Sequence, residues 1–170
     1  VMLIVHVIIG LGVGGAELML KRLVEGTNKN EGVKHSIISL TTLGGLGEEL
    51  KSYGVEVKAL GLQGVLTLPL VFFKLRQELK KKRPDIVQTW MYHGDILGGL
   101  AAKSAKVKQV IWNVRNTNVG LNSRMHKMLI KISAILSKVI PDKIIYVSQS
   151  AKSSHEMVGY DPTKTVVINN

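Results

Sequence analysis

Short apolar runs alternate with amphipathic segments along the whole chain. The apolar runs have the length of β-strands and predict strands at 2–9, 34–40, 55–60, 85–89, 108–113, 143–147 and 165–168. The segments between them have helical periodicity and predict α-helices at 15–26, 46–53, 69–82, 94–105, 121–139 and 149–158. Strands that alternate with helices in this way indicate right-handed crossovers and a parallel sheet covered on both faces. We therefore predict an α/β fold with one doubly wound, Rossmann-like parallel sheet of about seven strands.

The helix predicted at 121–139 has the clearest pattern. Its apolar residues form one stripe, which consists of Met125, Met128, Leu129, Ile132, Ile135, Leu136 and Val139. Its basic residues lie off this stripe and are Arg124, Lys127, Lys131 and Lys138. Such a division is typical of an amphipathic surface helix.

In a doubly wound sheet, ligands bind in the crevice outside the carboxyl ends of the strands. The loops expected at this edge are 10–15, 41–47, 89–95, 113–120 and 148–150. We therefore look for functional residues in these loops.

The first of these loops is rich in glycine and joins the first strand to the first helix. Gly10, Gly12 and Gly15 have the Gly-x-Gly-x-x-Gly spacing of the dinucleotide-binding fingerprint, in which helix amides face a phosphate. A nicotinamide site also needs an acidic residue at the end of the second strand, but no carboxylate follows until Glu48. A Walker P-loop is excluded because no Gly-Lys-Ser/Thr ends the turn. The turn is either a site for some phosphate-bearing ligand or a tight turn that binds none.

The chain is strongly basic, with 23 Lys and Arg against 12 Asp and Glu and a net charge of +11. This surplus favours polyanionic partners or is simply a solvated basic surface. Aromatic residues make up only 5% of the chain and are not interleaved with basic ones, so we expect no nucleic-acid partner. Cysteine is absent, which excludes disulfides and suits the cytoplasm. No apolar run approaches the ~18 residues that span a bilayer, and the start of the chain does not resemble a signal peptide.

Several motifs occur along the chain in a characteristic order. They are Gly-Gly-Ala-Glu at 14–17, the segment 46–55, Arg-Pro-Asp-Ile-Val and the following histidine loop at 83–93, and the segments 94–102, 147–150 and 164–170. This ordered set resembles the amino-terminal half of the family 4 retaining glycosyltransferases of GT-B architecture. The resemblance covers essentially the whole chain.

The resemblance implies a two-domain enzyme with its active site between two Rossmann-like domains. We expect residues 1–170 to be the amino-terminal, acceptor-side domain, ending at the interdomain hinge and inactive alone. The implied reaction moves a hexosyl group from a nucleotide-sugar donor to a glycan or lipid-linked acceptor, in the synthesis of surface polysaccharide or lipopolysaccharide. No cofactor is implied, because the nucleotide-sugar is a substrate held mostly by the second domain.

The resemblance also assigns candidate site residues. Gly14 and Gly15 would lie near the donor diphosphate, and His93 and Asp95 would bind acceptor hydroxyls. Arg115 and Asn116 end the fifth strand, where a guanidinium could hold a phosphate. His93 and Arg115 are the catalytic candidates, although many family members carry a histidine near Arg115.

Structural roles are open to several of the same residues. Asp95 and Glu17 would each favour a helix N-terminus, and His93 would cap its loop. We assign the other histidines to packing or surface, and these are His6, His35, His126 and His155. We expect no metal, because His93 and Asp95 alone make a poor ligand set.

A dense basic cluster lies at the end of the third helix and consists of Lys80, Lys81, Lys82 and Arg83. Cations are stabilised at a helix C-terminus, but this cluster would also dock on an anionic membrane. We expect a cytoplasmic protein. A further expectation is a peripheral position on the inner face of the plasma membrane. The alternatives are a freestanding Rossmann-like module that binds polyanions or a membrane surface, and an NAD(P)-binding domain.

Overall fold

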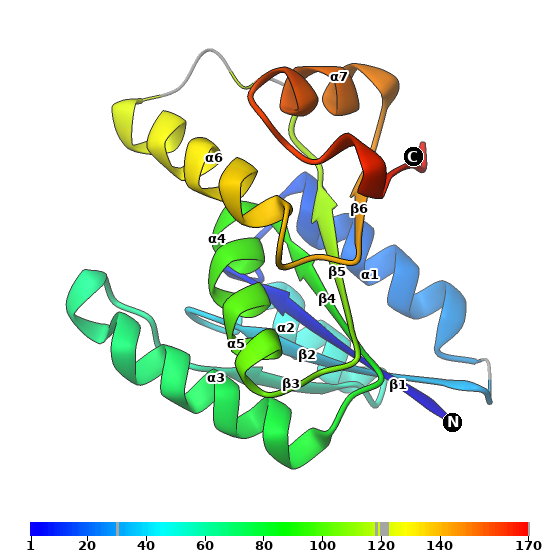
Figure 1. Cartoon of the computed structure of the whole chain (residues 1–170). Helices are drawn as coiled ribbons and strands as arrows, with labels where there is room; N and C mark the ends of the chain where they lie inside the picture. The colour runs from blue at the N-terminus through cyan, green and yellow to red at the C-terminus, as the bar shows by residue number, and fades with distance from the viewer. Residues whose placement is uncertain (30, 118, 120–122, 170) are drawn as a thin grey trace.

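The computed structural model describes all of the chain except residues 30, 118, 120–122 and 170. Its strands form one parallel sheet in the order β3-β2-β1-β4-β5-β6-β7 (Figure 1). The strands are β1 (Met2–Ile8), β2 (Val33–Ser39), β3 (Glu56–Ala59), β4 (Ile86–Trp90), β5 (Gln109–Val114), β6 (Lys143–Tyr146) and β7 (Thr165–Val167). Each predicted strand is present, and the doubly wound Rossmann-like fold is confirmed.

The predicted helices are present as well. They are α1 (Gly15–Thr27), α2 (Gly44–Ser52), α3 (Leu68–Lys82), α4 (Met91–His93) with α5 (Gly99–Ser104), α6 (Arg124–Ser137) and α7 (Gln149–Met157). The predicted helix 94–105 is composite, because a π-helical turn at Gly94–Gly98 joins α4 to α5. Short 3-10 turns at Val65–Thr67 and Pro162–Lys164 were not predicted. Some predictions fall outside the described residues: residues 121 and 122 of the predicted helix, residues 118 and 120 of the predicted loop 113–120, and residue 170 of the last motif.

The sheet separates two hydrophobic cores. Ile8 and Ile37 point to the face covered by α1 and α2, where they pack with Leu20 and Leu50. Their neighbours Val7 and Ile38 belong to the core on the other face, which α3, α5 and α6 cover (Figure 1). This alternation follows from the period of two of a β-strand, and it explains why central strands read as continuous apolar runs.

The helical segment after β4 lies unusually close to the sheet. A Cβ atom at Gly98 would stand 2.9 Å from Thr89 Cγ2, and one at Gly99 would stand 2.6 Å from Ile140 Cγ2. Only glycine fits such an approach. The close packing fixes α4, which carries His93, against the central strands.

Helix α6 packs mostly through residues outside its apolar stripe, although Leu129 and Leu136 of the stripe are partly buried against the core. Its buried residues are Ile130, Ser133, Ala134 and Ser137, whereas Met125 is 75% exposed and Ile135 is 68% exposed. The small residues of the buried face allow close contact with the rest of the fold. The apolar stripe predicted from the sequence is real, but most of it faces outward rather than into the core.

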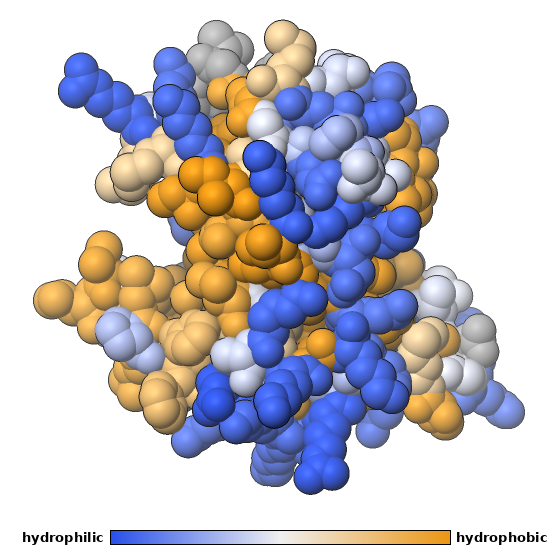
Figure 2. Space-filling view, viewed as in Figure 1, coloured by the Kyte–Doolittle hydropathy of each residue, from blue (hydrophilic) through white to orange (hydrophobic). Residues whose placement is uncertain are grey.

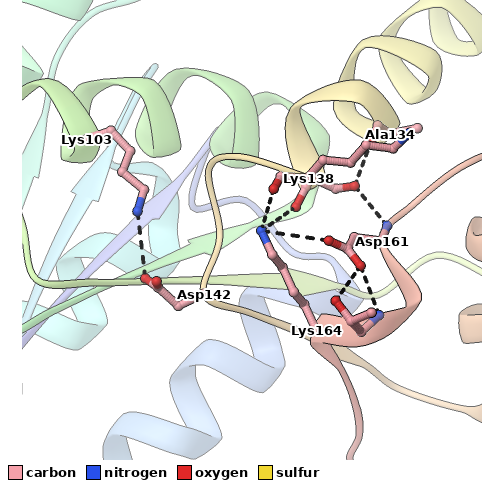
Figure 3. A network of polar contacts seen from close by, with 8 residues as sticks. Lys103, Ala134, Lys138, Asp142, Asp161 and Lys164 are labelled. Atoms are coloured by element: carbon pink, nitrogen blue, oxygen red, sulfur yellow. Dashed lines mark hydrogen bonds and ion pairs between the residues drawn. The ribbon is translucent and has the colours of Figure 1, made fainter.

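A polar network ties the segment before β7 to the end of α6 (Figure 3). The Lys164 ammonium donates to the carbonyls of Ser137 at 3.1 Å and Lys138 at 2.8 Å. The Asp161 amide donates to Ser137 Oγ at 3.0 Å, and Asp161 Oδ2 lies 4.0 Å from Lys164 Nζ. A cation at these carbonyls stabilises the helix C-terminus and so anchors the last strand.

Candidate functional site

A cavity of about 440 Å³ opens at the carboxyl ends of β1 and β4. These two strands are neighbours, but the chain leaves them toward opposite edges of the sheet. Such a topological switch point is where doubly wound sheets bind ligands. The cavity is lined by Ile8, Ile9, Gly15, Ala16, Glu17, Met91, Tyr92, His93, Arg115, Asn116 and His126.

The N-terminus of α1 forms one wall of the cavity. Gly14 is the N-cap residue of α1 and has no side chain that could accept a hydrogen bond from the first-turn amides. The N-terminus of an α-helix can bind an anion through its first-turn amides, which here belong to Gly15 and Ala16. The carboxylate of Glu17 folds back toward Gly14, whereas Gly15 faces open space. Gly15 lines the cavity, whereas Gly14, the residue before it, is not among the lining residues.

The short helix α4, which directly follows β4, forms another wall. Met91 has a φ of 64°, in the left-handed region that residues other than glycine rarely adopt. Its sulfur accepts a hydrogen bond from the Arg115 amide at 3.4 Å. Tyr92 follows and pairs its hydroxyl with His155 Nε2 at 2.7 Å. Backbone strain of this kind costs about 1 to 3 kcal/mol and is concentrated at functional sites.

Two histidines meet in the cavity, one predicted and one not. Burial, with a further effect of nearby His126, lowers the pKa of His93, so its imidazole is neutral at neutral pH. The Tyr92 ring packs edge-on against His126, with ring centroids 5.2 Å apart. From the sequence, we assigned His126 to packing or surface. The missed signal is topological, because α6 follows β5 and its first turn lies at the same edge of the sheet.

Arg115 brings a positive charge to the cavity. Its Nη1 donates to Asn113 Oδ1 at 3.4 Å, and its guanidinium carbon lies 6.0 Å from the centroid of the Trp90 ring. Half-burial lowers the pKa of Arg115, but an arginine remains charged at any physiological pH. Asn116 lines the cavity beside it. The predicted placement of both residues in the crevice is therefore confirmed, while their roles stay predictions.

Asp95 does not face the crevice, and that expectation is wrong. Its side chain is fully buried, and its Oδ1 accepts a hydrogen bond from Thr89 Oγ1 at 2.5 Å. Burial raises the pKa of Asp95 well above its usual range, which favours the protonated form. Asp95 lies in the π-helical turn, where its side chain is directed into the core and does not line the cavity. Asp95 therefore supports the β4–α4 junction and cannot contact an acceptor in this structure.

His6 and His35 form a buried hydrogen-bonded chain under α1. Trp90 Nε1 donates to His6 Nδ1 at 3.2 Å, His6 Nε2 lies 3.0 Å from His35 Nδ1, and His35 Nε2 lies 2.8 Å from Thr27 Oγ1. Because the indole nitrogen can only donate, His6 must donate onward to His35. Burial lowers the pKa of His6 to about 3. The structural role predicted for these histidines is confirmed, and buried His155 has one as well.

The basic cluster Lys80–Arg83 lies at the opposite edge of the sheet. It follows α3 and precedes β4, so it stands at the amino ends of the strands. Lys80 and Arg83 line a second hollow of about 520 Å³ together with Lys106 and Lys108. Lys82 makes an ion pair with Glu56 at 2.5 Å. This cluster is therefore separate from the cavity at the carboxyl edge.

Among the residues that the structure describes, no group of three or more His, Cys, Asp or Glu is placed to hold a metal ion. The cavity instead combines a helix N-terminus, a guanidinium and two imidazoles. Such groups bind and stabilise anionic oxygens and hydroxyls.

A comparison with protein families decides the assignment. The family model for Glycosyltransferase Family 4 matches residues 13–170. The chain belongs to this family. The resemblance read from the ordered motifs is thereby confirmed. No curated protein matches the chain in a sequence comparison.

Solved structures with the same fold include sugar-nucleotide enzymes. HepE from Anabaena, in complex with UDP-glucose, superimposes with a TM-score of 0.79 at 18% identity, covering 99% of this chain and 44% of its own. The UDP-N-acetylglucosamine 2-epimerase from Rickettsia bellii gives 0.71 at 16% identity, covering 99% and 45%. The lipopolysaccharide outer core galactosyltransferase WaaB gives 0.71 at 13% identity, covering 99% and 46%. The chain thus spans less than half the length of these structures, and at these identities the likeness shows the fold.

Proposed function

We propose that this chain is the acceptor-side domain of a retaining glycosyltransferase that moves a hexosyl group from a nucleotide-sugar to a glycan or lipid-linked acceptor. The observation that carries the proposal is the convergence of the α1 N-terminus, Arg115, His93 and His126 on one cavity at the switch point of the sheet. Membership in Glycosyltransferase Family 4 gives the reaction class. The similar HepE structure was determined with UDP-glucose, which supports a nucleotide-sugar donor.

In the proposed reaction, the bond between the sugar and the diphosphate breaks while negative charge grows on the departing phosphate oxygens. The amides of Gly15 and Ala16 and the guanidinium of Arg115 would stabilise that charge. The second domain would hold most of the donor, as the family resemblance implies. No cofactor takes part in this scheme, because the nucleotide-sugar is itself a substrate.

The acceptor hydroxyl would lie between His93 and His126. His93 is neutral because burial lowers its pKa, so it can accept a hydrogen bond from that hydroxyl and orient it toward the donor carbon. Asn116 offers both a donor and an acceptor group at the same wall. Surface polysaccharide or lipopolysaccharide synthesis, at the inner face of the plasma membrane, is the setting we propose.

An NAD(P)-binding role has less support. At the end of β2 the chain carries hydroxyl groups that already hydrogen-bond to backbone carbonyls. Thr41 Oγ1 donates to the Ile9 carbonyl at 2.6 Å, and Ser39 Oγ donates to the Thr42 carbonyl at 2.6 Å. The ribose of a nicotinamide cofactor requires a carboxylate at this place.

The test is a donor screen of the full-length protein. It would be incubated with UDP-, GDP- and ADP-sugars and with glycan and glycolipid acceptors, and release of nucleoside diphosphate would be measured. We expect acceptor-dependent release with one donor, and a large loss of rate in His93→Ala. Binding of NADH at micromolar affinity without any nucleoside diphosphate release would reject the proposal.

A further inference from the structure

Two exposed apolar patches border the carboxyl edge of the sheet. The α3 lip consists of Val65, Leu66, Leu70 and Phe73, and the α6 lip consists of Met125, Met128, Ile132, Ile135 and Val139. Leu66 is 98% exposed and Phe73 is 59% exposed. Figure 2 shows hydrophobic residues gathered on the left of the molecule, above and below an indentation. Apolar groupings of this kind mark interaction surfaces.

An apolar hollow of about 210 Å³ lies between the two lips. It is lined by Leu40, Leu62, Leu68, His93, Ile96, Leu97 and Leu129. His93 is shared between this hollow and the cavity of the candidate site. The apolar hollow between the lips and the polar groups of the site therefore adjoin at His93.

The lips carry positive charge and almost no negative charge. Lys74 follows Phe73 on α3, and α6 contributes Arg124, Lys127 and Lys131, all of them exposed. Helix α6 contains no acidic residue. On α3 the acidic residue is Glu78, which is paired with Lys58 at 2.5 Å. The surface is therefore apolar and cationic at once.

We propose that the α3 lip and the α6 lip dock this domain onto an anionic lipid bilayer. Leu66, Phe73 and Met128 enter the boundary between head groups and acyl chains, while the flanking lysines contact lipid phosphates. A protein partner fits this surface less well, because lysine is depleted from protein–protein interfaces. At a bilayer, by contrast, lysine stems lie along apolar surface while their ammonium groups reach the head groups.

The proposed docking surface is not the basic cluster at Lys80–Arg83. The structure exposes no large apolar side chain in the segments 79–85 and 105–108, all of which it describes. No helix in the described part of the chain is long and apolar enough to cross a membrane. Docking through the lips extends the proposed function, since it would bring the site to a lipid-linked acceptor. Vesicle binding needs neither substrate, so it can be tested even if the transferase proposal fails.

The first experiment measures binding of the full-length protein to sedimented vesicles. We expect binding to vesicles of phosphatidylcholine with phosphatidylglycerol, and little to phosphatidylcholine alone. The double variant Leu66→Glu/Met128→Glu should bind at least tenfold more weakly. The variant Lys80→Glu/Lys81→Glu, which makes a larger change in charge, should lose less than threefold.

The second experiment places a reporter on each side of the molecule. Both native tryptophans, Trp90 and Trp112, are buried, so an added exposed tryptophan is read against a protected background. In Leu66→Trp, vesicles should shift the emission to the blue and brominated lipids should quench it. The matched variant is Met157→Trp, because Met157 is similarly exposed, at 87%, but lies at the end of α7. Its emission should not change.

Three results would overturn the proposal. The first is no binding to anionic vesicles, and the second is a larger loss in Lys80→Glu/Lys81→Glu than in the lip variant. The third is a change of oligomeric mass, by light scattering, in the lip variant without vesicles, which would show that a second copy of the protein covers the lips.

Discussion

The two edges of the sheet each hold a hollow of similar size, about 440 Å³ at the carboxyl edge and about 520 Å³ at the amino edge. The amino edge is the more basic, with Lys80, Arg83, Lys106 and Lys108 around its hollow. These cations lie at the C-terminal ends of α3 and α5, where the helix dipole already favours positive charge. The carboxyl edge instead gathers a helix N-terminus, a half-buried guanidinium and two imidazoles. Converging polar groups of different kinds, rather than net charge, mark the functional edge.

Backbone strain gives the same contrast. Arg83, with a φ of 48°, is the C-cap of α3, and Lys106, with a φ of 59°, follows the C-cap of α5. A left-handed residue is ordinary at such helix ends. Met91 has a φ of 64° at the first residue of α4, directly after β4, at the wall of the candidate site. The same unusual conformation therefore has a structural explanation at one edge and calls for a functional one at the other.

The largest predicted effect comes from removing the guanidinium at the carboxyl edge. In the full-length enzyme, Arg115→Ala should lower kcat/KM for the donor by about a hundredfold, because it removes a charged donor to the leaving diphosphate. Lys108→Ala makes the same change in charge at the amino edge and should change kcat/KM by less than about twofold. Steady-state kinetics of the two variants would check this. Equal losses in both would break the comparison between the edges.

The next effect concerns the histidines beneath the carboxyl edge, which we consider structural. The folded protein keeps His6 neutral because burial lowers its pKa to about 3, while the unfolded chain binds a proton below about pH 6.5. The contribution of neutral His6 to the free energy of unfolding is therefore fully present above about pH 6.5 and is lost progressively as the pH falls toward about 3. We expect a loss of about 2 kcal/mol from His6 between pH 7 and pH 5.

Urea unfolding at both pH values would measure this loss. His6→Gln should show a smaller loss, by about the contribution of one proton, with the remainder coming from other histidines whose pKa burial lowers, such as His155. An equal slope in the variant and the wild type would contradict the structural assignment.

A smaller effect is predicted at the glycine turn. A Cβ at Gly15 meets nothing within 4 Å, so Gly15→Ala should leave the free energy of unfolding within about 0.5 kcal/mol. The methyl group would stand in the cavity, and we expect it to weaken donor binding by about tenfold, or 1.4 kcal/mol. Gly26→Ala is the matched control, because Gly26 is also unobstructed but lies at the far end of α1. Unchanged donor affinity in Gly15→Ala, measured by calorimetry, would favour a turn that binds no ligand.

The smallest effect tests our explanation of cations at helix C-termini. Lys164 donates to two carbonyls at the end of α6 (Figure 3), and Lys164→Ala should cost about 1 kcal/mol of stability. Lys81→Ala, at an exposed position in the last turn of α3, should cost less than about 0.5 kcal/mol. Urea denaturation would compare the two. A larger cost at Lys81 would show that the basic cluster has a structural role that its exposure does not suggest.

The fold could be predicted because the apolar runs and their spacing specify strands and crossovers directly. The boundaries agree to within a few residues, and the glycine turn, His93, Arg115 and Asn116 were correctly placed at the carboxyl edge. Asp95 was misplaced because nothing local indicates the π-helical turn in which its side chain is directed into the core. The direction that the α6 stripe faces was not predicted, because periodicity shows a stripe but not which side of the helix packs. Only tertiary contacts decide that small residues such as Ser133 and Ala134 face the core.

The central claim is that the carboxyl edge binds the donor and the amino edge does not. Amide hydrogen exchange of the full-length protein, with and without a nucleotide-sugar such as UDP-glucose, tests it most directly. We predict slower exchange in the segments 10–17, 91–93 and 115–117 on adding the donor, and unchanged exchange in 79–85 and 105–108. Protection confined to 79–85 and 105–108 would contradict the account, as would the absence of protection with every UDP-, GDP- and ADP-sugar tried.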